Sequence, residues 1–427
     1  MKLRSILKAW VPMEAAWLLM AVEGPFIAAV IARLAEPKLN LAAFGVAFPF
    51  AMLFEAPIIL IMSASTALVR DGDSLSKLRR FTWALNGGIT LGMLLFVLPP
   101  VFRLVMVGMD LPMEIWKLIH GACILFLPWP AAIGYRRFHQ GILIRHGLTR
   151  RVAYGTTLRL VSMGGTALLG ALFLPWPGVW IGALAMSTGV TFEAIASGLW
   201  ARSSMVRLKA TPHEGAGLTY GAITRFYAPL ATTAILAFGV NPLVSFFLGH
   251  SSRPLESLAV MPVVNAFLFI FNTAGFTFQE VAIPFMDQGR EARKALGRVA
   301  GYLALGASGL LMLVAFTPLS RLWFQGVAGL TPALAAFAVL PLALLTLQPA
   351  LTVLLSFQRA YLVVKRITRP ITWATALEVG GITVVLFVLT RLFHLDGAPA
   401  AAAALVLGRT ASGAYLLPKT RDLFRRA

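Results

Sequence analysis

The chain has 427 residues, of which 58% are hydrophobic and only 13% are charged. A soluble domain carries about 25% charged residues, so this composition excludes a protein that is water-soluble throughout. The net charge is +20, but no soluble basic domain is present that could bind nucleic acid, and we expect the excess Lys and Arg in loops on one side of a membrane. The only cysteine, Cys123, excludes an intrachain disulfide and a multi-cysteine metal site.

Sequence motifs of enzymes and ATPases are absent from the chain. It contains no P-loop, no GxSxG, no HExxH and no GxGxxG that opens a helix. We therefore expect no enzymatic activity, no cofactor and no metal. Any transport should be driven by an ion gradient, of protons or sodium, rather than by ATP.

Apolar runs recur along the whole chain, and a bilayer-crossing helix needs roughly 20 such residues. The first run is too long for the apolar part of a signal peptide, which predicts a retained helix. Gly and Pro within the runs predict bends of the kind that membrane helices make around a cavity. The pattern predicts an all-α polytopic membrane protein with twelve transmembrane helices, at 10–33, 40–69, 81–107, 113–145, 150–174, 177–202, 218–249, 256–286, 296–318, 332–364, 370–393 and 398–418.

The distribution of basic residues between loops predicts the orientation in the membrane. The N-terminus, the C-terminus and the loops after even-numbered helices hold 24 of the 37 Lys and Arg, and the opposite side holds 7. Because basic loops stay in the cytoplasm, both termini are predicted to be cytoplasmic, in the inner or plasma membrane.

The two halves of the chain resemble each other. Residues 127–151 have a fainter copy 219 positions later, in which Pro130 matches Pro349 and Phe138 matches Phe357. Nearer the N-terminus the offset is 217, as for the match of Pro25 with Pro242. Repeats with an even number of helices are parallel, so a substrate is expected near the midplane between them. The predicted domains are an N-terminal six-helix lobe (1–202), a cytoplasmic linker (203–217) and a C-terminal six-helix lobe (218–427).

Charged residues inside the predicted helices are the candidates for function, because a charge in the hydrocarbon costs about 3 kcal/mol on insertion scales and is therefore usually paired or beside water. They are Arg136, Arg137, Arg159, Arg225, Arg359 and Arg409 among the bases, and Glu14, Glu23, Glu55, Glu193, Glu280 and Glu378 among the acids.

Arg159 and Glu378 occupy the same place in the repeat and are the most informative pair. They form either a salt bridge between the halves or a substrate-facing arginine with a proton-accepting glutamate. Arg136 and Arg137 differ by 100° around their helix, so only one is expected to face a cavity squarely. The nearby His139 either titrates or is a hydrogen-bonded helix histidine.

The remaining candidates lie elsewhere in the predicted helices. Arg409 lies too far from either end of its predicted helix for its side chain to reach the membrane surface, so it is expected to line a cavity. Glu193 is its approximate counterpart in the first repeat. Glu23 precedes Gly24-Pro25, where the first helix should break and a carboxylate could hold a proton or cation. Glu55 and Glu280 are weaker versions of the same idea. Arg225 and Arg359 lie near a helix end, where snorkelling is favoured.

Several stretches resemble the multidrug/oligosaccharidyl-lipid/polysaccharide exporter superfamily. They include the Gly-x-Thr-Arg exit at 147–150 and the segment Leu41-Ala-Ala-Phe-Gly-Val-Ala47. Within that superfamily the chain is most similar to the progressive ankylosis proteins, through His139-Gln-Gly-Ile-Leu-Ile-Arg-His146, Val11-Pro12, Pro57, the FYAPLA stretch at 226–231, Pro242 and 365–368.

The resemblance implies a secondary transporter that exports anionic metabolites such as citrate, ATP and pyrophosphate. In the resembling family the position of Arg159 carries an acid and that of Glu378 an arginine, so the charges are exchanged here, which favours the salt bridge. One alternative is a proton-coupled multidrug exporter, although helices 7 and 10 lack the acids of a sodium site. A lipid-linked sugar flippase and a non-transporting scaffold or scramblase are further alternatives.

We therefore expect a monomeric exporter of a small anion that works by alternating access. The predicted substrate-binding residues are Arg159, Glu378, Arg136, Arg137, His139 and Arg409. The predicted ion-coupling residues are Glu23, Glu55, Glu193 and Glu280.

Overall fold

The computed structural model describes residues 3–212, 217–286, 288–365, 367 and 369–421, and every element in them is helical. The order of these elements along the chain is α1 (Leu3–Ala21), α2 (Glu23–Ala32), α3 (Pro37–Glu55), α4 (Ile61–Leu68), α5 (Gly72–Phe96), α6 (Pro99–Gly108), α7 (Met113–Leu125), α8 (Pro128–Arg145), α9 (Thr149–Phe173), α10 (Gly178–Ala210), α11 (Tyr220–Gly249), α12 (Pro254–Met286), α13 (Arg290–Ala315), α14 (Leu319–Arg321), η1 (Leu322–Val327), α15 (Pro332–Leu344), η2 (Leu345–Leu347), α16 (Gln348–Val364), α17 (Arg369–Phe387), η3 (Val388–Leu392), α18 (Gly397–Leu416) and η4 (Leu417–Thr420).

The predicted multi-pass membrane fold is confirmed. In the described part of the chain, eleven helical spans are long and apolar enough to cross a bilayer, and the number becomes twelve if the bent pair α5–α6 counts as one. The bend between α5 and α6 is 73°. It arises because Pro99 and Pro100 open α6, and the residue before a proline, Leu98, takes extended backbone.

The second predicted span is a broken helix, whereas the first is interrupted at a single residue and still crosses as one span, Ser5–Ala32. The junction of α1 and α2 lies at Val22, beside the predicted Gly24-Pro25 bend, but helical hydrogen bonds from Val22 to Leu18 and from Phe26 to Val22 continue through it. The second span is interrupted at residues 56–60, where Pro57 has no N–H to continue the helix. Its carbonyl accepts a hydrogen bond of 2.7 Å from the hydroxyl of Tyr227. The repeat counterparts α11 and α12 contain prolines but remain continuous.

The predicted linker is shorter than the sequence suggests. Helix α10 continues to Ala210, so the first eight residues of the predicted linker 203–217 are helical. Arg207 and Lys209 lie in its last turn, where positive charge stabilises the helix dipole. Residues 213–216 lie outside the described part of the chain.

The chain forms two compact units. Unit 1 comprises Met1–Arg33, Pro37–Ala42 and Leu243–Ala427, and unit 2 comprises Leu34–Glu36 and Ala43–Pro242. These units group α1 and α2 with helices of the C-terminal half, and most of α11 with helices of the N-terminal half. The division into six-helix lobes at 1–202 and 218–427 therefore describes the sequence repeat and stays a prediction.

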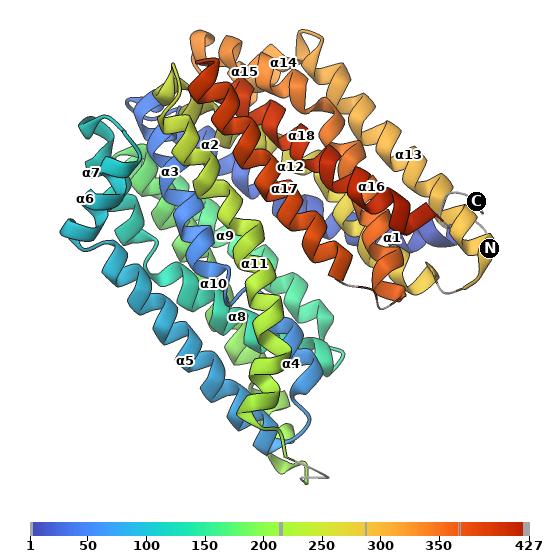
Figure 1. Cartoon of the computed structure of the whole chain (residues 1–427). Helices are drawn as coiled ribbons and strands as arrows, with labels where there is room; N and C mark the ends of the chain where they lie inside the picture. Colours follow the sequence, from blue (N-terminus) through green and yellow to red (C-terminus); the bar gives the residue numbers. More distant parts are fainter. Residues whose placement is uncertain (1–2, 213–216, 287, 366, 368, 422–427) are drawn as a thin grey trace. The chain divides into compact units, whose positions relative to one another are not determined.

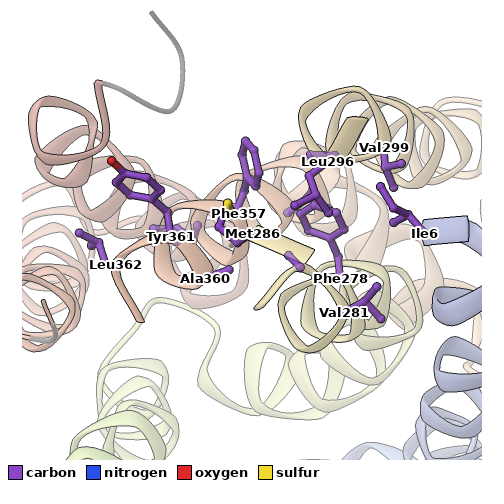
Figure 2. Packing of buried hydrophobic residues seen from close by; sticks show 14 of the residues in the cluster. Ile6, Phe278, Val281, Met286, Leu296, Val299, Phe357, Ala360, Tyr361 and Leu362 are labelled. Carbon is purple, nitrogen blue, oxygen red and sulfur yellow. The ribbon is translucent and has the colours of Figure 1, made fainter. Parts of the chain in front are cut away.

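A buried apolar cluster explains why α1 belongs to unit 1. Ile6 of α1 packs into a cluster formed by α12, α13 and α16, which also holds Leu296 (Figure 2). The rings of Phe278 and Phe357 lie 5.9 Å apart in this cluster. Because lipid is as apolar as these side chains, close packing rather than escape from water stabilises such a cluster.

Glycines allow helices of unit 2 to approach each other closely. A Cβ on Gly141 of α8 would lie 2.6 Å from the carbonyl oxygen of Met62 on α4, and one on Gly134 would lie 2.6 Å from Ile58. Gly141 thus faces α4, whereas Gly134, two turns earlier, faces Asn86 of α5 and Ile58 in the break before α4.

The same close contact occurs once in each unit. A Cβ on Gly189 of α10 would lie 3.0 Å from the carbonyl oxygen of Arg159 on α9. In unit 1, a Cβ on Gly408 of α18 would lie 2.8 Å from the carbonyl oxygen of Glu378 on α17. Each pair is related by the 219-residue offset, which supports the predicted repeat in three dimensions. Helices α16, α17 and α18 run beside one another in unit 1 (Figure 1).

We predict that Gly141→Ala destabilises the protein by about 1–3 kcal/mol, because the new methyl group must displace the backbone of α4. Gly165→Ala in α9 is the matched control, since a Cβ there meets nothing within 4 Å. Unfolding of both variants in mixed micelles, followed by tryptophan fluorescence, measures the difference. Equal stabilities would contradict the close contact.

Candidate functional site

In unit 2, one carboxylate receives two guanidinium groups. Glu193 of α10 is 1% exposed, and its Oε2 accepts a short hydrogen bond from Nη1 of Arg136 on α8. Nε of Arg159 on α9 lies 3.4 Å from the same oxygen. The other oxygen, Oε1, accepts a hydrogen bond of 3.0 Å from the side-chain amide of Gln140. Gly155 of α9 leaves room for this carboxylate, because a Cβ there would lie 3.3 Å from its Cγ.

Arg137 lies outside this ion cluster. The described residues place no carboxylate within ion-pair distance of it, and its Nη1 contacts only the sulfur of Met62, at 3.8 Å. Glu55, at the end of α3, accepts a hydrogen bond from the indole of Trp129 and interacts electrostatically with the three arginines of α8 and α9. This part of unit 2 therefore holds three arginines and two glutamates.

Unit 1 has a corresponding cluster around Glu378 of α17. Its Oε1 accepts a hydrogen bond of 2.9 Å from Nε of Arg409 on α18, and its Oε2 lies 3.7 Å from Nη2 of Arg359 on α16. Arg409 also donates a hydrogen bond of 2.8 Å to the hydroxyl of Thr352, which contacts Oδ1 of Asn272 at 3.0 Å. Two guanidinium groups again share one carboxylate.

The clusters give Arg159 and Glu378 partners within their own units. Arg159 faces Glu193, and Glu378 faces Arg409 and Arg359. Neither residue needs the other to be neutralised, so a direct bridge between them stays a prediction. The sign of the charge is exchanged between the repeats. Helix α9 of unit 2 carries Arg159, and its repeat counterpart α17 of unit 1 carries Glu378.

Some residues of the clusters were not chosen from the sequence as binding residues. Arg359 was expected to snorkel, but its guanidinium lies beside Glu378. Gln140, an uncharged residue that the sequence did not mark as a candidate, donates to Glu193. Gln140 and Arg359 occupy equivalent positions at the 219-residue offset. This equivalence is the sequence feature from which both could have been predicted as site residues.

His139 is buried but takes part in neither cluster. Its Nδ1–H donates a hydrogen bond of 2.8 Å to the carbonyl of Tyr135, one turn earlier, and its ring lies 4.2 Å from the Tyr135 ring. This is the geometry of a hydrogen-bonded helix histidine, which was one of the two readings open from the sequence. A role in substrate binding stays a prediction.

The acids of unit 1 lie mainly on or beside α1. Glu280 of α12 interacts with Trp17 of α1, and Glu23 is half-buried at the start of α2. Glu14, which was not among the predicted ion-coupling residues, is buried between α1 and α12. Its two oxygens accept hydrogen bonds from Thr273 at 2.7 Å and Thr277 at 2.5 Å. Its place inside an apolar helix was the signal in the sequence.

Comparisons with known proteins show the fold. No protein-family model and no curated protein matches the chain. Among solved structures, the chain is similar to an inward-facing multidrug resistance MATE family transporter of the MOP superfamily, with a TM-score of 0.75, 15% identity and coverage of 100% of this chain and 99% of the other. It is also similar to the lipid II flippase MurJ in an inward closed conformation, with a TM-score of 0.72, 13% identity and coverage of 97% and 90%.

A third solved structure is a MOP superfamily transporter from Pyrococcus furiosus, described as having a binding pocket of reverse polarity that suggests a different function. The TM-score is 0.67, with 14% identity and coverage of 99% of this chain and 96% of the other. The chain therefore has a MATE-like fold over its full length. The resemblance to progressive ankylosis proteins stays a prediction.

We predict that Glu193→Gln lowers the free energy of unfolding by about 3–5 kcal/mol, because it removes the carboxylate that two buried guanidinium groups share. Adding Arg136→Met should restore part of the loss, since it removes one of the uncompensated charges. The control is Asp73→Asn, which breaks a half-exposed pair with Lys77 and should change stability by less than about 1 kcal/mol. Similar losses for Glu193→Gln and Asp73→Asn would refute the cluster.

Proposed function

We propose that the chain is a secondary active transporter that exports a small anionic metabolite, of the citrate, nucleotide or pyrophosphate kind, by alternating access between its two lobes. Both termini face the cytoplasm in this proposal. The observation that carries it is the excess of arginine over glutamate inside the membrane-spanning part of unit 2.

The excess matters because intramembrane charges are expensive unless they are neutralised. Arg136 and Arg159 share the carboxylate of Glu193, and Glu55 is hydrogen-bonded to an indole N–H. Arg137 keeps its charge without an ion-pair partner in the described part of the chain. An anion entering the unit would supply the missing negative charge, whereas a cationic drug would be repelled.

The structural neighbours support a transport function without defining the substrate. A multidrug exporter and a lipid II flippase both share the fold, so the fold accommodates different cargo. The Pyrococcus furiosus transporter is described as having a binding pocket of reverse polarity that suggests a different function, which is consistent with different cargo on this fold.

A second candidate function, proton-coupled export of an organic cation, is favoured by the acids of unit 1. Of the twelve charged residues predicted within helices, unit 1 holds Glu14, Glu23, Glu280 and Glu378 but only Arg359 and Arg409. The same acids would serve the anion exporter as sites for the coupling proton, so they do not separate the two functions. The arginine excess in unit 2 favours the anion.

We predict that proteoliposomes containing the protein take up radiolabelled citrate or pyrophosphate and that Arg159→Gln lowers the initial rate at least about tenfold, because a charged contact to the substrate is worth about 1.5–3 kcal/mol. Arg159→Lys should retain part of the rate, because lysine keeps the positive charge but lacks the planar set of N–H donors of a guanidinium. Uptake of tetraphenylphosphonium should be absent.

The control for this experiment is Arg225→Gln, because Arg225 is exposed near the start of α11 and belongs to neither cluster. Its rate should stay within about twofold of the wild type. Transport of tetraphenylphosphonium but of no anion would reject the anion exporter in favour of the second candidate.

We predict that Glu14→Gln abolishes acceleration of transport by an imposed pH gradient while anion–anion exchange continues. The amide cannot gain or lose the proton that a buried carboxylate exchanges during coupling. Glu114→Gln, at an exposed position in the first turn of α7, is the control and should respond to the gradient like the wild type. An undiminished response of Glu14→Gln would exclude Glu14 as the coupling site.

A further inference from the structure

Several helix ends meet at one end of unit 1, around the buried apolar cluster. The cluster includes Ile6 near the start of α1, Met286 at the end of α12 and Leu296 in the second turn of α13 (Figure 2). It also includes Leu362 near the end of α16 and Leu416 at the end of α18. Because these residues pack in one cluster, the helix ends that carry them lie close together. This is the end of unit 1 that we propose to be cytoplasmic.

These helix ends are strongly basic. They contain fourteen Lys and Arg but only three acids, counted over residues 1–8, 286–298, 364–369 and 416–427. In the described part of the chain, the exposed basic side chains at these ends are Lys8, Arg298, Lys365, Arg369, Lys419 and Arg421. We call these six residues the basic end of unit 1. Basic loops orient a membrane protein whether or not they bind a partner, so the contacts of these residues have to show whether they do more.

The ion pairs of unit 1 lie away from the basic end. In the residues that the structure describes, they join Lys38 to Glu256, Arg253 to Asp396, and Arg359 and Arg409 to Glu378. Lys38 and Arg253 belong to the opposite end of the unit, where Arg33 also donates to the backbone carbonyls of Gly326 and Val327. The basic end therefore has more positive charge than the acids around it balance, and it favours a negatively charged partner.

Two lysines of the basic end are held over tyrosine rings. Both follow the pattern Tyr-Leu-x-x-Lys, at 361–365 and at 415–419. Nζ of Lys419 lies 3.0 Å from the centroid of the Tyr415 ring, and Nζ of Lys365 lies 5.9 Å from the centroid of the Tyr361 ring. The tyrosines pack in or against the apolar cluster, so these cation–π contacts position the two ammonium groups without neutralising them.

A buried amide ties the two lysine-bearing segments to each other. The side chain of Gln358 in α16 is 0% exposed and donates to the carbonyl of Gly413 at 3.2 Å and to the hydroxyl of Thr420 at 3.5 Å. Thr420 follows Lys419 in η4, and η4 contacts α16. Lys365, which directly follows α16, and Lys419 therefore lie on neighbouring segments of the same end.

An exposed tryptophan indicates the depth of the basic end in the membrane. Arg369 opens α17, and Trp373 lies one turn further along this helix with 67% of its surface exposed. Residues four apart share a helix face, so both side chains lie on the same side of α17. Tryptophan is enriched where the hydrocarbon meets the headgroups, and Lys and Arg extend from there towards the headgroups. The basic end therefore lies at the depth of the lipid phosphates.

We propose that the basic end of unit 1 binds the headgroup of an anionic phospholipid, whose phosphate oxygens accept hydrogen bonds from Lys365, Lys419 and Arg369. The phosphate supplies the negative charge that this end lacks, and the bilayer holds it at the depth indicated by Trp373. Ammonium and guanidinium groups both make charge-assisted hydrogen bonds to phosphate. The site does not depend on which solute the protein transports.

The test is native mass spectrometry of the purified protein in neutral detergent, titrated with phosphatidylglycerol or with phosphatidylcholine of the same acyl chains. The wild type should bind phosphatidylglycerol at least about tenfold more tightly, because only this lipid carries a net negative charge. Lys365→Gln combined with Lys419→Gln should reduce the preference at least about fivefold. The matched control is Arg321→Gln combined with Arg391→Gln, which removes the same charge from exposed positions at the opposite end and should leave the preference unchanged.

A charge-conserving variant separates lipid binding from folding. Lys365→Arg combined with Lys419→Arg should keep the preference for phosphatidylglycerol. All the variants should melt close to the wild-type temperature in detergent without added lipid, because the altered side chains are exposed. Equal binding of the two lipids by the wild type, or an equal loss in the Arg321 and Arg391 variant, would overturn the site. Displacement of bound phosphatidylglycerol by millimolar pyrophosphate would assign the basic end to soluble anions and would also overturn it.

Discussion

One buried carboxylate shared by two guanidinium groups organises unit 2. Glu193 holds Arg136 from α8 and Arg159 from α9, so three helices are tied together at one point in the membrane-spanning region. The arrangement needs Gly155 and Gly189, because side chains at these positions would meet the carboxylate and the backbone of α9. The membrane-spanning part of unit 2 thus holds more arginines than glutamates around this point.

The repeat preserves this arrangement while exchanging its charges. In unit 1, Glu378 stands where Arg159 stands in unit 2, and the arginine comes from α18. The close approach at Gly408 is the same as at Gly189, because it depends on backbone contact rather than on charge. The helix packing therefore determines where the ion cluster lies. Which helix carries the glutamate and which carry the arginines differs between the two units.

The membrane class, the helical spans and the repeat could be predicted because they depend on composition and on spacing along the chain. The equivalence of Arg159 and Glu378 was visible for the same reason. Their partners were not, since ion pairing depends on how each helix is rotated about its axis. Arg136 and Arg137 show this limit: adjacent in sequence, they differ by 100° on the helix, and only Arg136 meets Glu193. The units were also hidden, because the packing of α1 on α12 is a long-range contact.

The separation of charge between the units bears on how coupling could work in the proposed transporter. Arginines dominate the membrane-spanning charges of unit 2 and glutamates those of unit 1, so an anion and a proton would act on different units. Two continuous helices pass from one unit to the other, α3 at Ala42–Ala43 and α11 at Pro242–Leu243. Because a helix is stiff along its axis, these two helices are the segments through which binding in one unit would act on the other in the proposed transporter.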